Sequence, residues 1–273
     1  MSVNAIDALF RRLRDQGRTA FIPFVTAGDP DLATTARVVR ELAGCGANLI
    51  EIGFPYSDPI ADGPVIQASY TRALDRGLRL DDVFACARVI ADAPEFAGGK
   101  VPLLAMTSYS LVHRRGPEAF LRQARAAGFS GAIVPDLPCE ESEALGALAA
   151  GQDFKLVQLV TPATPRARAE EIARRSTGFL YCVSVTGITG ERDQLPADLA
   201  ANVRGLKQLT DRPVCVGFGI SQPRHVKQLV GTADGAIVGS FIVRRMKSEL
   251  RSPRETLVAA IRNEVAGLSE STG

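Results

Sequence analysis

Eight short apolar segments, separated by stretches long enough for helices, constrain the fold of this chain more than any other feature. The segments are rich in Val, Ile, Leu and Phe, and most are nearly continuous apolar runs, the pattern of a parallel strand buried on both faces. The runs begin at Ala20, Ala47, Val101, Gly131, Lys155, Phe179, Pro213 and Gly235, with helices expected at residues 32–42, 117–127, 140–150 and 223–229. Eight strand–helix units in 273 residues predict an α/β fold, the closed (β/α)₈ or TIM barrel. An open doubly wound sheet would usually have fewer strands and a GxGxxG turn.

The composition is that of an ordinary globular domain. Hydrophobic residues make up 46% of the chain and charged residues 23%, which argues against disordered and fibrous classes. The net charge is only +2 and no run of five basic residues occurs, so nucleic acid is not expected as a partner. Because about 250 residues commonly form one barrel, we expect a single domain over residues 1–268 with a disordered tail at 269–273.

The N-terminal segment and the cysteines bear on the cellular compartment. Ile6, Leu9, Phe10 and Leu13 have helical spacing among charged residues, which predicts a docked helix and not a signal peptide. No apolar stretch approaches the roughly 18 residues of a membrane helix. The five cysteines are scattered without a CxxC pair, which favours reduced thiols over a disulfide framework or a zinc site. A cytoplasmic protein without membrane contact is therefore expected.

Carboxylates near the ends of the predicted strands are the candidate catalytic groups, because the active site of such a barrel forms where its strands end. They are Asp29, Glu51, Asp58, Asp62 and Asp136. Glu51 lies inside the predicted strand LIEIG, where a carboxylate is costly unless it is paired or used in chemistry. Burial would raise its pKa and suit it to general acid–base catalysis. A structural Glu held by a backbone or Arg partner is the alternative.

Asp62 lies in a loop-like segment that opens the oversized connection after the second strand. Locally, IADGP is typical of an Asx turn. The long loop can also fold Asp62 over the barrel mouth beside Glu51, which would give two carboxylates in different environments and with different roles. Asp58 is expected to be exposed, in a turn or at a partner contact, and Asp136 is expected to support neighbouring groups of the site.

Lysines and histidines give little support for other barrel chemistries. No lysine lies at the predicted carboxyl end of a strand, which disfavours a Schiff-base aldolase. The two histidines, His113 and His225, lie in helical surroundings without metal-ligand spacing, so no metal site is predicted. Each histidine is expected at the surface.

Glycines cluster after the last three predicted strands. Gly187 and Gly190 follow the sixth, Gly217 and Gly219 the seventh, and Gly239 with Ser240 the eighth. Glycines let backbone N–H groups approach an anion, and barrels often hold phosphate with their last two loops and a helix N-terminus. Each glycine alone could serve a tight turn, but together they predict a phosphorylated substrate.

Six segments resemble, in order and spacing, the tryptophan synthase α chain family. They are FIPFVTAGDP from Phe21, EIGFPYSDPIADGPVIQ from Glu51, VPDLPCEES from Val134, SVTGITG from Ser184, GFGIS from Gly217 and AIVGS from Ala236. The match covers nearly the whole chain. It implies a lyase of tryptophan biosynthesis that cleaves indole-3-glycerol phosphate to indole and glyceraldehyde 3-phosphate by a retro-aldol reaction, without a cofactor in this chain.

The resemblance also implies residue roles. Glu51 matches the general acid–base, which would protonate indole C3 and help remove a glycerol hydroxyl proton. Asp62 matches the carboxylate that holds the indole N–H and stabilises positive charge. The implied substrate and phosphate contacts are Phe24, Tyr181, Gly187, Thr189, Gly190, Phe218, Gly219, Gly239 and Ser240. The loop 187–190 resembles a mobile lid. For the three aromatic residues, packing alone is the alternative.

A partner follows from the resemblance as well. A β subunit carrying pyridoxal phosphate would receive indole through a tunnel in an α₂β₂ heterotetramer. The implied contacts with it are Pro55, Tyr56, Ser57, Asp58, Pro59 and Ser110. The chain departs from the family after the third strand, where MTSYSL stands in place of MTYYNP, so that Ser108 replaces a pocket tyrosine and Ser110 an asparagine near the interface.

Two other hypotheses remain open, and the changes at Ser108 and Ser110 support only the first of them. One is a stand-alone indole-3-glycerol phosphate lyase that releases free indole. The other is a catalytically idle barrel that binds phosphate ligands as a regulatory partner. The intact Glu51 and Asp62 argue against the idle barrel, because it has no reason to carry a costly carboxylate in a strand.

Overall fold

The computed structural model describes residues 3–60, 62–184, 195–217, 219–220, 222–248 and 267–272. Within these ranges eight parallel strands close into a barrel, each strand pairing with its neighbours in chain order and β1 pairing with β8. The strands are β1 (Ala20–Thr26), β2 (Ile50–Gly53), β3 (Leu103–Met106), β4 (Phe129–Ile133), β5 (Lys155–Val160), β6 (Leu180–Val183), β7 (Val214–Gly217) and β8 (Gly235–Val238). The predicted barrel is confirmed, and every predicted apolar run overlaps one strand.

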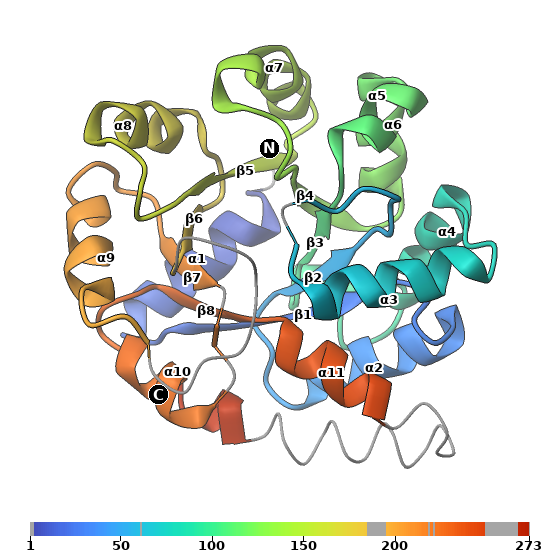
Figure 1. The fold of residues 1–273 in the computed structure, drawn as a ribbon, viewed down its shortest axis with the longest axis horizontal. Helices are drawn as coiled ribbons and strands as arrows, with labels where there is room; N and C mark the ends of the chain where they lie inside the picture. The colour runs from blue at the N-terminus through green and yellow to red at the C-terminus, as the bar shows by residue number, and fades with distance from the viewer. Residues whose placement is uncertain are drawn as a thin grey trace.

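Helices surround the barrel in chain order (Figure 1). They are α2 (Leu32–Gly44), α3 (Pro64–Asp75), α4 (Leu80–Ala91), α5 (Tyr109–Arg115), α6 (Pro117–Ala126), α7 (Glu143–Gly151), α8 (Arg166–Arg175), α9 (Leu199–Lys207), α10 (Pro223–Leu229) and α11 (Ser240–Ser248), with 3₁₀ turns at Ala97–Gly99 and Cys139–Glu141. The oversized connection after β2 contains both α3 and α4. The helix expected at 140–150 is divided, because a 3₁₀ turn precedes α7.

Two separate layers of apolar side chains hold the barrel together. The outer layer lies between the strands and the surrounding helices and includes Phe21, Ile50 and Ile52. The inner layer fills the barrel and includes Phe24 and Leu104. The alternation follows from the two-residue period of a strand, which sends successive side chains to opposite faces. In β2 this period places Ile50 and Ile52 outside and Glu51 inside.

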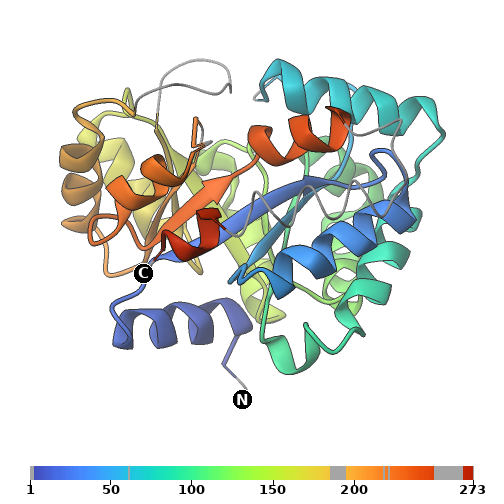
Figure 2. The ribbon, with the colours of Figure 1, turned by 90° about the horizontal axis from the view of Figure 1, so that it is seen from below.

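The N-terminal helix α1 (Ala5–Asp15) lies across one end of the barrel, apart from the ring of helices (Figure 2). Its buried side chains are Ile6, Leu9, Phe10 and Leu13, the four that the sequence assigns to a docked face. The rings of Phe10 and Phe179 lie 5.6 Å apart at this end. The Asn4 side chain accepts a hydrogen bond from Ile6 N and so caps the helix.

The C-terminal segment differs from the sequence-based expectation. Residues 269–273 are predicted to be a disordered tail, but the described part of this segment packs against the barrel. Ser271 and Thr272 are buried, and the Thr272 carbonyl accepts a hydrogen bond from Thr19 N at 3.3 Å. The physical reason is that a small polar residue can be buried when its backbone groups find partners.

His225 also corrects the sequence analysis. His113 is exposed as expected, but His225 is completely buried. Together with Val226 and Leu229 it forms the buried face of α10, so the helix period and not the residue type decides its position. Cys139, Cys182 and Cys215 are buried and Cys45 and Cys86 are partly buried, and all five are reduced thiols outside any disulfide. In the described part of the chain no helix is long and apolar enough to cross a membrane.

Candidate active site

Glu51 lies in the interior of the barrel. Its register partners on the adjacent strands are Phe24 and Leu104, both members of the inner apolar layer. The residue is 1% exposed, and its Oε1 has no hydrogen-bond partner within the described ranges. Burial raises the pKa of this carboxyl from 4.5 to about 8, because the charged form loses hydration. The structural alternative, a Glu held by a backbone or Arg partner, finds no support at Oε1 among the described residues.

Asp62 is folded into the same end of the barrel. The loop turns at Pro59, whose carbonyl accepts from Asp62 N at 3.1 Å. Gln67 Nε2 donates to the Asp62 carbonyl at 2.7 Å and to the Pro59 carbonyl at 3.2 Å, which fixes the loop on α3. The Asp62 residue is only 2% exposed. The loop therefore does make a turn here, as its local sequence predicts, but the turn buries the carboxylate.

The two carboxyl groups have different surroundings. Burial raises the pKa of Asp62 to about 6, against a smaller lowering by a hydrogen bond that the Tyr56 hydroxyl donates to Oδ2 at 3.4 Å. No such donor lowers the pKa of Glu51. Its value of about 8 lies about two units above the pKa of Asp62, which is about 6. At neutral pH the Asp62 side chain is mostly ionised and the Glu51 side chain mostly protonated, which is the arrangement an acid–base site requires.

Two buried tyrosines lie close enough to both carboxylates for the charge of each to affect their pKa. The charges of Glu51 and Asp62 both contribute to raising the pKa of Tyr70 in α3 and of Tyr181 in β6, although burial is the larger cause. Both carboxylates therefore act on both phenols, as expected of groups gathered at one end of the barrel. A Cβ atom at Gly217 would overlap the Tyr181 hydroxyl, so glycine at this position admits the phenol into the interior.

The candidate phosphate loops are described only in part. Gly187, Thr189, Gly190 and Phe218 lie outside the described residues. Gly219 has a φ of +77°, a left-handed backbone that favours glycine.

Gly239 and Ser240 join β8 to α11, so that Ser240 is the first residue of that helix. A Cβ atom on Gly239 would come no closer than 3.5 Å to Phe24, an ordinary contact. Packing within the described structure therefore does not require glycine at position 239. The free N–H groups at the start of α11 suit an anion.

The expected partner-contact residues form a half-buried rim. Pro55 and Tyr56 are buried, whereas Ser57 and Asp58 are exposed, and Ser57 Oγ donates to Asp58 Oδ2 at 2.8 Å. Beside them is a groove of about 790 Å³ whose lining includes Pro55, Tyr56, Ser57, Ser110 and Leu111. Residues 55–57 and Ser110 therefore line the same surface groove. The exposed position of Asp58 agrees with its prediction.

Two other strand-end carboxylates have structural partners. Asp136 Oδ1 accepts from Tyr109 N at 2.8 Å and so fixes the start of α5. Asp29 is buried and forms a bidentate ion pair with Arg72 of α3, at 3.0 Å and 2.6 Å. This pair joins the β1–α2 loop to α3, the helix that carries Gln67. It was not anticipated from the sequence, since nothing local connects positions 43 residues apart.

Tyr70 is the site residue that sequence reasoning missed. It lies with Ile66 and Ala73 on the buried face of α3. The spacing of these positions is the signal that could have found it, because residues three and four apart share a helix face. The three prolines between residues 54 and 67 give this segment a loop-like composition, which obscures the helical period that begins at Pro64.

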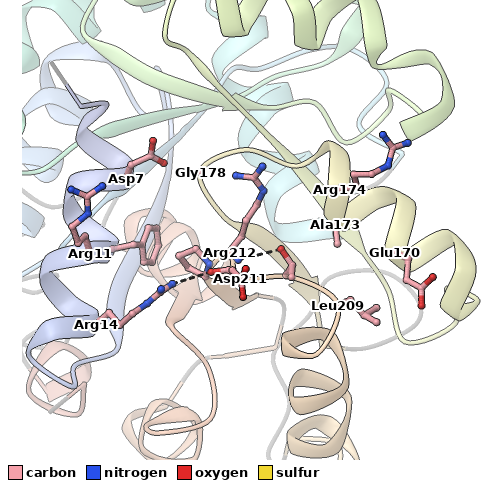
Figure 3. A pocket seen from close by; sticks show the side chains of 13 residues that line it. Asp7, Arg11, Arg14, Glu170, Ala173, Arg174, Gly178, Leu209, Asp211 and Arg212 are labelled. Atoms are coloured by element: carbon pink, nitrogen blue, oxygen red, sulfur yellow. Dashed lines mark hydrogen bonds between the residues drawn. The ribbon is translucent and has the colours of Figure 1, made fainter. Parts of the chain in front are cut away.

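A second cavity, of about 700 Å³, lies at the opposite, amino-terminal end of the barrel (Figure 3). Its charged lining residues are Asp7, Arg11, Arg14, Glu170, Arg174, Asp211 and Arg212. Arg14 donates to the Asp211 carbonyl at 3.0 Å, and Asp7 pairs with Lys155 at 2.6 Å. Side chains of both charges line this cavity, so its charge does not indicate one chemical class of ligand. Across the described ranges no group of three or more His, Cys, Asp or Glu could hold a metal ion.

The chain is a closed parallel (β/α)₈ barrel with two buried carboxyl groups at one end, an arrangement typical of barrel enzymes that use acid–base catalysis. The family profile described as "Tryptophan synthase alpha chain" matches residues 10–271. The chain therefore belongs to the tryptophan synthase α chain family, as the six sequence segments indicate.

Individual relatives agree over nearly the full length. The tryptophan synthase alpha chain of Rhodopirellula baltica is 48% identical over 251 residues, covering 92% of this chain and 90% of its own. The Synechocystis alpha chain is 48% identical over 245 residues, with 89% and 91% covered. Among solved structures, the alpha subunit from Legionella pneumophila has a TM-score of 0.90 at 28% identity, covering 99% of both chains. A chain of the tryptophan synthase α₂β₂ complex from Pyrococcus furiosus has a TM-score of 0.83 at 35% identity, with 92% and 97% covered.

Proposed function

We propose that this chain cleaves indole-3-glycerol phosphate to indole and glyceraldehyde 3-phosphate with Glu51 and Asp62 as its catalytic residues. The observation that carries the proposal is the separation of their pKa values, about 8 and about 6, in one buried end of the barrel. Membership of the α-chain family indicates the reaction. The two carboxyl groups provide the general acid and the fixed negative charge that this reaction needs.

Glu51 serves both proton transfers in turn. In its protonated form it gives its proton to C3 of the indole ring, which leaves positive charge on the ring nitrogen. The resulting carboxylate then removes the proton of the hydroxyl on the glycerol carbon bonded to C3. That carbon becomes the aldehyde of glyceraldehyde 3-phosphate as the C–C bond breaks, and the bonding electron pair returns to the indole ring. Glu51 ends protonated, so the cycle needs no outside acid or base.

Asp62 acts as the partner of the ring nitrogen. Its pKa of about 6 keeps it mostly ionised at neutral pH, so its negative charge stabilises the positive charge that develops on the protonated ring. The Tyr56 hydroxyl, 3.4 Å from Oδ2, holds the ionised form. Phe24 and Tyr181, both in the inner layer of the barrel, are suited to contact the indole ring.

Phosphate binding falls on the loops after the last strands. The N-terminus of α11 at Gly239 and Ser240 and the left-handed backbone at Gly219 favour an anion at this position. Gly187, Thr189, Gly190 and Phe218 complete the proposed contacts, on the sequence resemblance alone. The segment 187–190 is assigned the role of a lid on the same basis.

The proposed partner is a tryptophan synthase β chain in an α₂β₂ assembly. The proposed contact consists of Pro55, Tyr56, Ser57, Asp58, Pro59 and Ser110. Of these, Pro55, Tyr56, Ser57 and Ser110 line the same groove. Pyridoxal phosphate belongs to the β chain and has no part in the cleavage step, for which the α chain needs no cofactor. A single barrel domain and a location in the cytoplasm complete the proposal.

The experiment is to incubate the purified chain with indole-3-glycerol phosphate, alone and with a tryptophan synthase β subunit, and to measure both products. Equal amounts of indole and glyceraldehyde 3-phosphate are expected, at a rate that rises when β is added. If the chain alone releases indole fast and the rate does not change when the β subunit is added, the stand-alone lyase would be favoured. Absence of both products with its own β chain present would refute the proposed function.

A further inference from the structure

Tyr70 contains a buried polar atom that the interior of the protein leaves unsatisfied. The residue is 1% exposed, and its hydroxyl has no hydrogen-bond partner within the described ranges. Glu51 Oε1 is a second such atom. A buried polar atom without a partner costs free energy, and where one persists a ligand or a bound water commonly completes it.

The ring of Tyr70 is held firmly in place. It packs against the ring of Tyr56, with centroids 5.4 Å apart and planes inclined by 57°, and both rings belong to the inner apolar layer with Phe24. Tyr56 in turn donates to Asp62. The Tyr70 hydroxyl is therefore fixed within the carboxylate site by a ring that packing alone keeps in position.

Gly53 shows where that hydroxyl lies relative to Glu51. A Cβ atom on Gly53 would come within 2.8 Å of the Tyr70 oxygen, so the hydroxyl occupies the space in front of Gly53. Glu51 and Gly53 are two residues apart in one strand, so both face the interior, with Cα atoms separated by roughly 6.7 Å. The phenol oxygen therefore lies beside the next inward-facing position of β2 after Glu51, and the charge of Glu51 acts on it.

The electrostatic environment keeps Tyr70 protonated. Burial is the main cause of its raised pKa, and the charges of Asp62, Tyr56 and Glu51 raise it further. A phenol that stays protonated can donate a hydrogen bond at every pH at which the site works. A single hydroxyl oxygen placed between the two groups could accept from Tyr70 and donate to Glu51, which would satisfy both unpartnered atoms.

We propose that Tyr70 is a further catalytic residue, whose hydroxyl donates a hydrogen bond to the glycerol hydroxyl that Glu51 deprotonates. The inference rests on the proposed function, since it names the substrate atom that the same site binds. As Glu51 removes the proton, negative charge develops on the substrate oxygen, and the Tyr70 O–H stabilises it until the aldehyde forms. The Tyr70 proton itself is not transferred.

The test is Tyr70→Phe, which removes the hydroxyl and keeps the ring that packs on Tyr56. With indole-3-glycerol phosphate, kcat is expected to fall at least tenfold while KM changes less than threefold, because the hydrogen bond strengthens in the transition state. Binding of indolepropanol phosphate, which lacks both glycerol hydroxyls, is expected to stay within twofold of wild type. Tyr109→Phe is the matched control, since Tyr109 lies outside the site beside His113, 6.0 Å between ring centroids.

The outcomes separate this inference from the proposed function. If the wild type is active and the kcat of Tyr70→Phe lies within twofold of the wild-type value, the role of Tyr70 is refuted. The roles of Glu51 and Asp62 would then stand. An equal loss of indolepropanol phosphate binding and of kcat would show that Tyr70 only maintains the shape of the pocket, which also overturns the inference. A wild type that releases neither product would refute the proposed function, and the role of Tyr70 would fall with it.

Discussion

The Tyr56 hydroxyl donates a hydrogen bond to Asp62 Oδ2 at 3.4 Å, from a position six residues earlier in the same loop. The bond favours the ionised carboxylate and opposes the effect of burial, which raises the pKa of Asp62 to about 6. One loop therefore supplies both the negative charge and the group that stabilises it, while Glu51 comes from the neighbouring strand.

The pH dependence of turnover should report both carboxyl groups. Cleavage needs Asp62 ionised and Glu51 protonated, so kcat/KM is expected to be bell-shaped, with limbs near pH 6 and pH 8. Tyr56→Phe removes the bond that lowers the pKa of Asp62, so the acid limb should move to higher pH while the alkaline limb stays. A shift of the alkaline limb alone would contradict the pairing of Tyr56 with Asp62.

Asp62→Asn should separate charge from binding. The amide keeps the size of the side chain and cannot supply the negative charge, so we expect kcat to fall by about a hundredfold or more while indolepropanol phosphate still binds. Asp75→Asn, at the exposed end of α3, makes the same chemical change away from the site and should leave kcat unchanged. Normal turnover in Asp62→Asn would reduce Asp62 to a turn residue.

Gly239→Ala tests the phosphate site without disturbing the fold. The atoms nearest to the added Cβ in the described structure belong to Phe24, at 3.5 Å or more, so the free energy of unfolding should change by no more than about 0.5 kcal/mol. The methyl group would keep a phosphate away from the start of α11, so KM should rise about tenfold with kcat little changed. An unaltered KM would place the phosphate elsewhere. Thermal unfolding and steady-state kinetics measure the two effects.

Glu51 should make the stability of the protein depend on pH. Its pKa is raised from 4.5 to about 8 in the folded state, so the folded chain holds this proton more tightly than the unfolded chain. Stability is therefore lost as the pH rises from 4.5 through 8. The side chain in Glu51→Gln does not titrate, so the variant should become more stable relative to wild type as the pH rises across this window. For a shift of this size the difference in unfolding free energy should reach a few kcal/mol, on the order of 1.4 kcal/mol per pKa unit. A gain independent of pH would contradict the raised pKa.

Much of the fold was predictable because the barrel imposes its period on the sequence. Strands buried on both faces must be nearly all apolar, so the eight runs mark the strands, and the carboxylate in LIEIG stands out against them. Boundaries were less accurate where the ladder, and not the apolar run, sets the strand. For example, β2 begins at Ile50 although its apolar run begins at Ala47.

The parts of the site that were missed depend on contacts between distant segments. The local sequence of Asp62 predicts a turn, and only the anchoring of the loop by Gln67 to α3 buries the carboxylate. Tyr70 enters the site because Gly53 leaves room for its hydroxyl, a relationship across 17 positions that no local pattern contains. His225 is buried by the face of its helix, which overrides the usual preference of histidine for partly exposed positions.

The central claim, that Glu51 transfers the protons, is tested most directly by comparing Glu51→Gln with wild type in two measurements on the same preparation. The account predicts that indole release from indole-3-glycerol phosphate falls by at least about a thousandfold, while the affinity for indolepropanol phosphate stays within a few-fold of wild type. Near-normal indole release by Glu51→Gln would contradict the account and remove Glu51 from the mechanism.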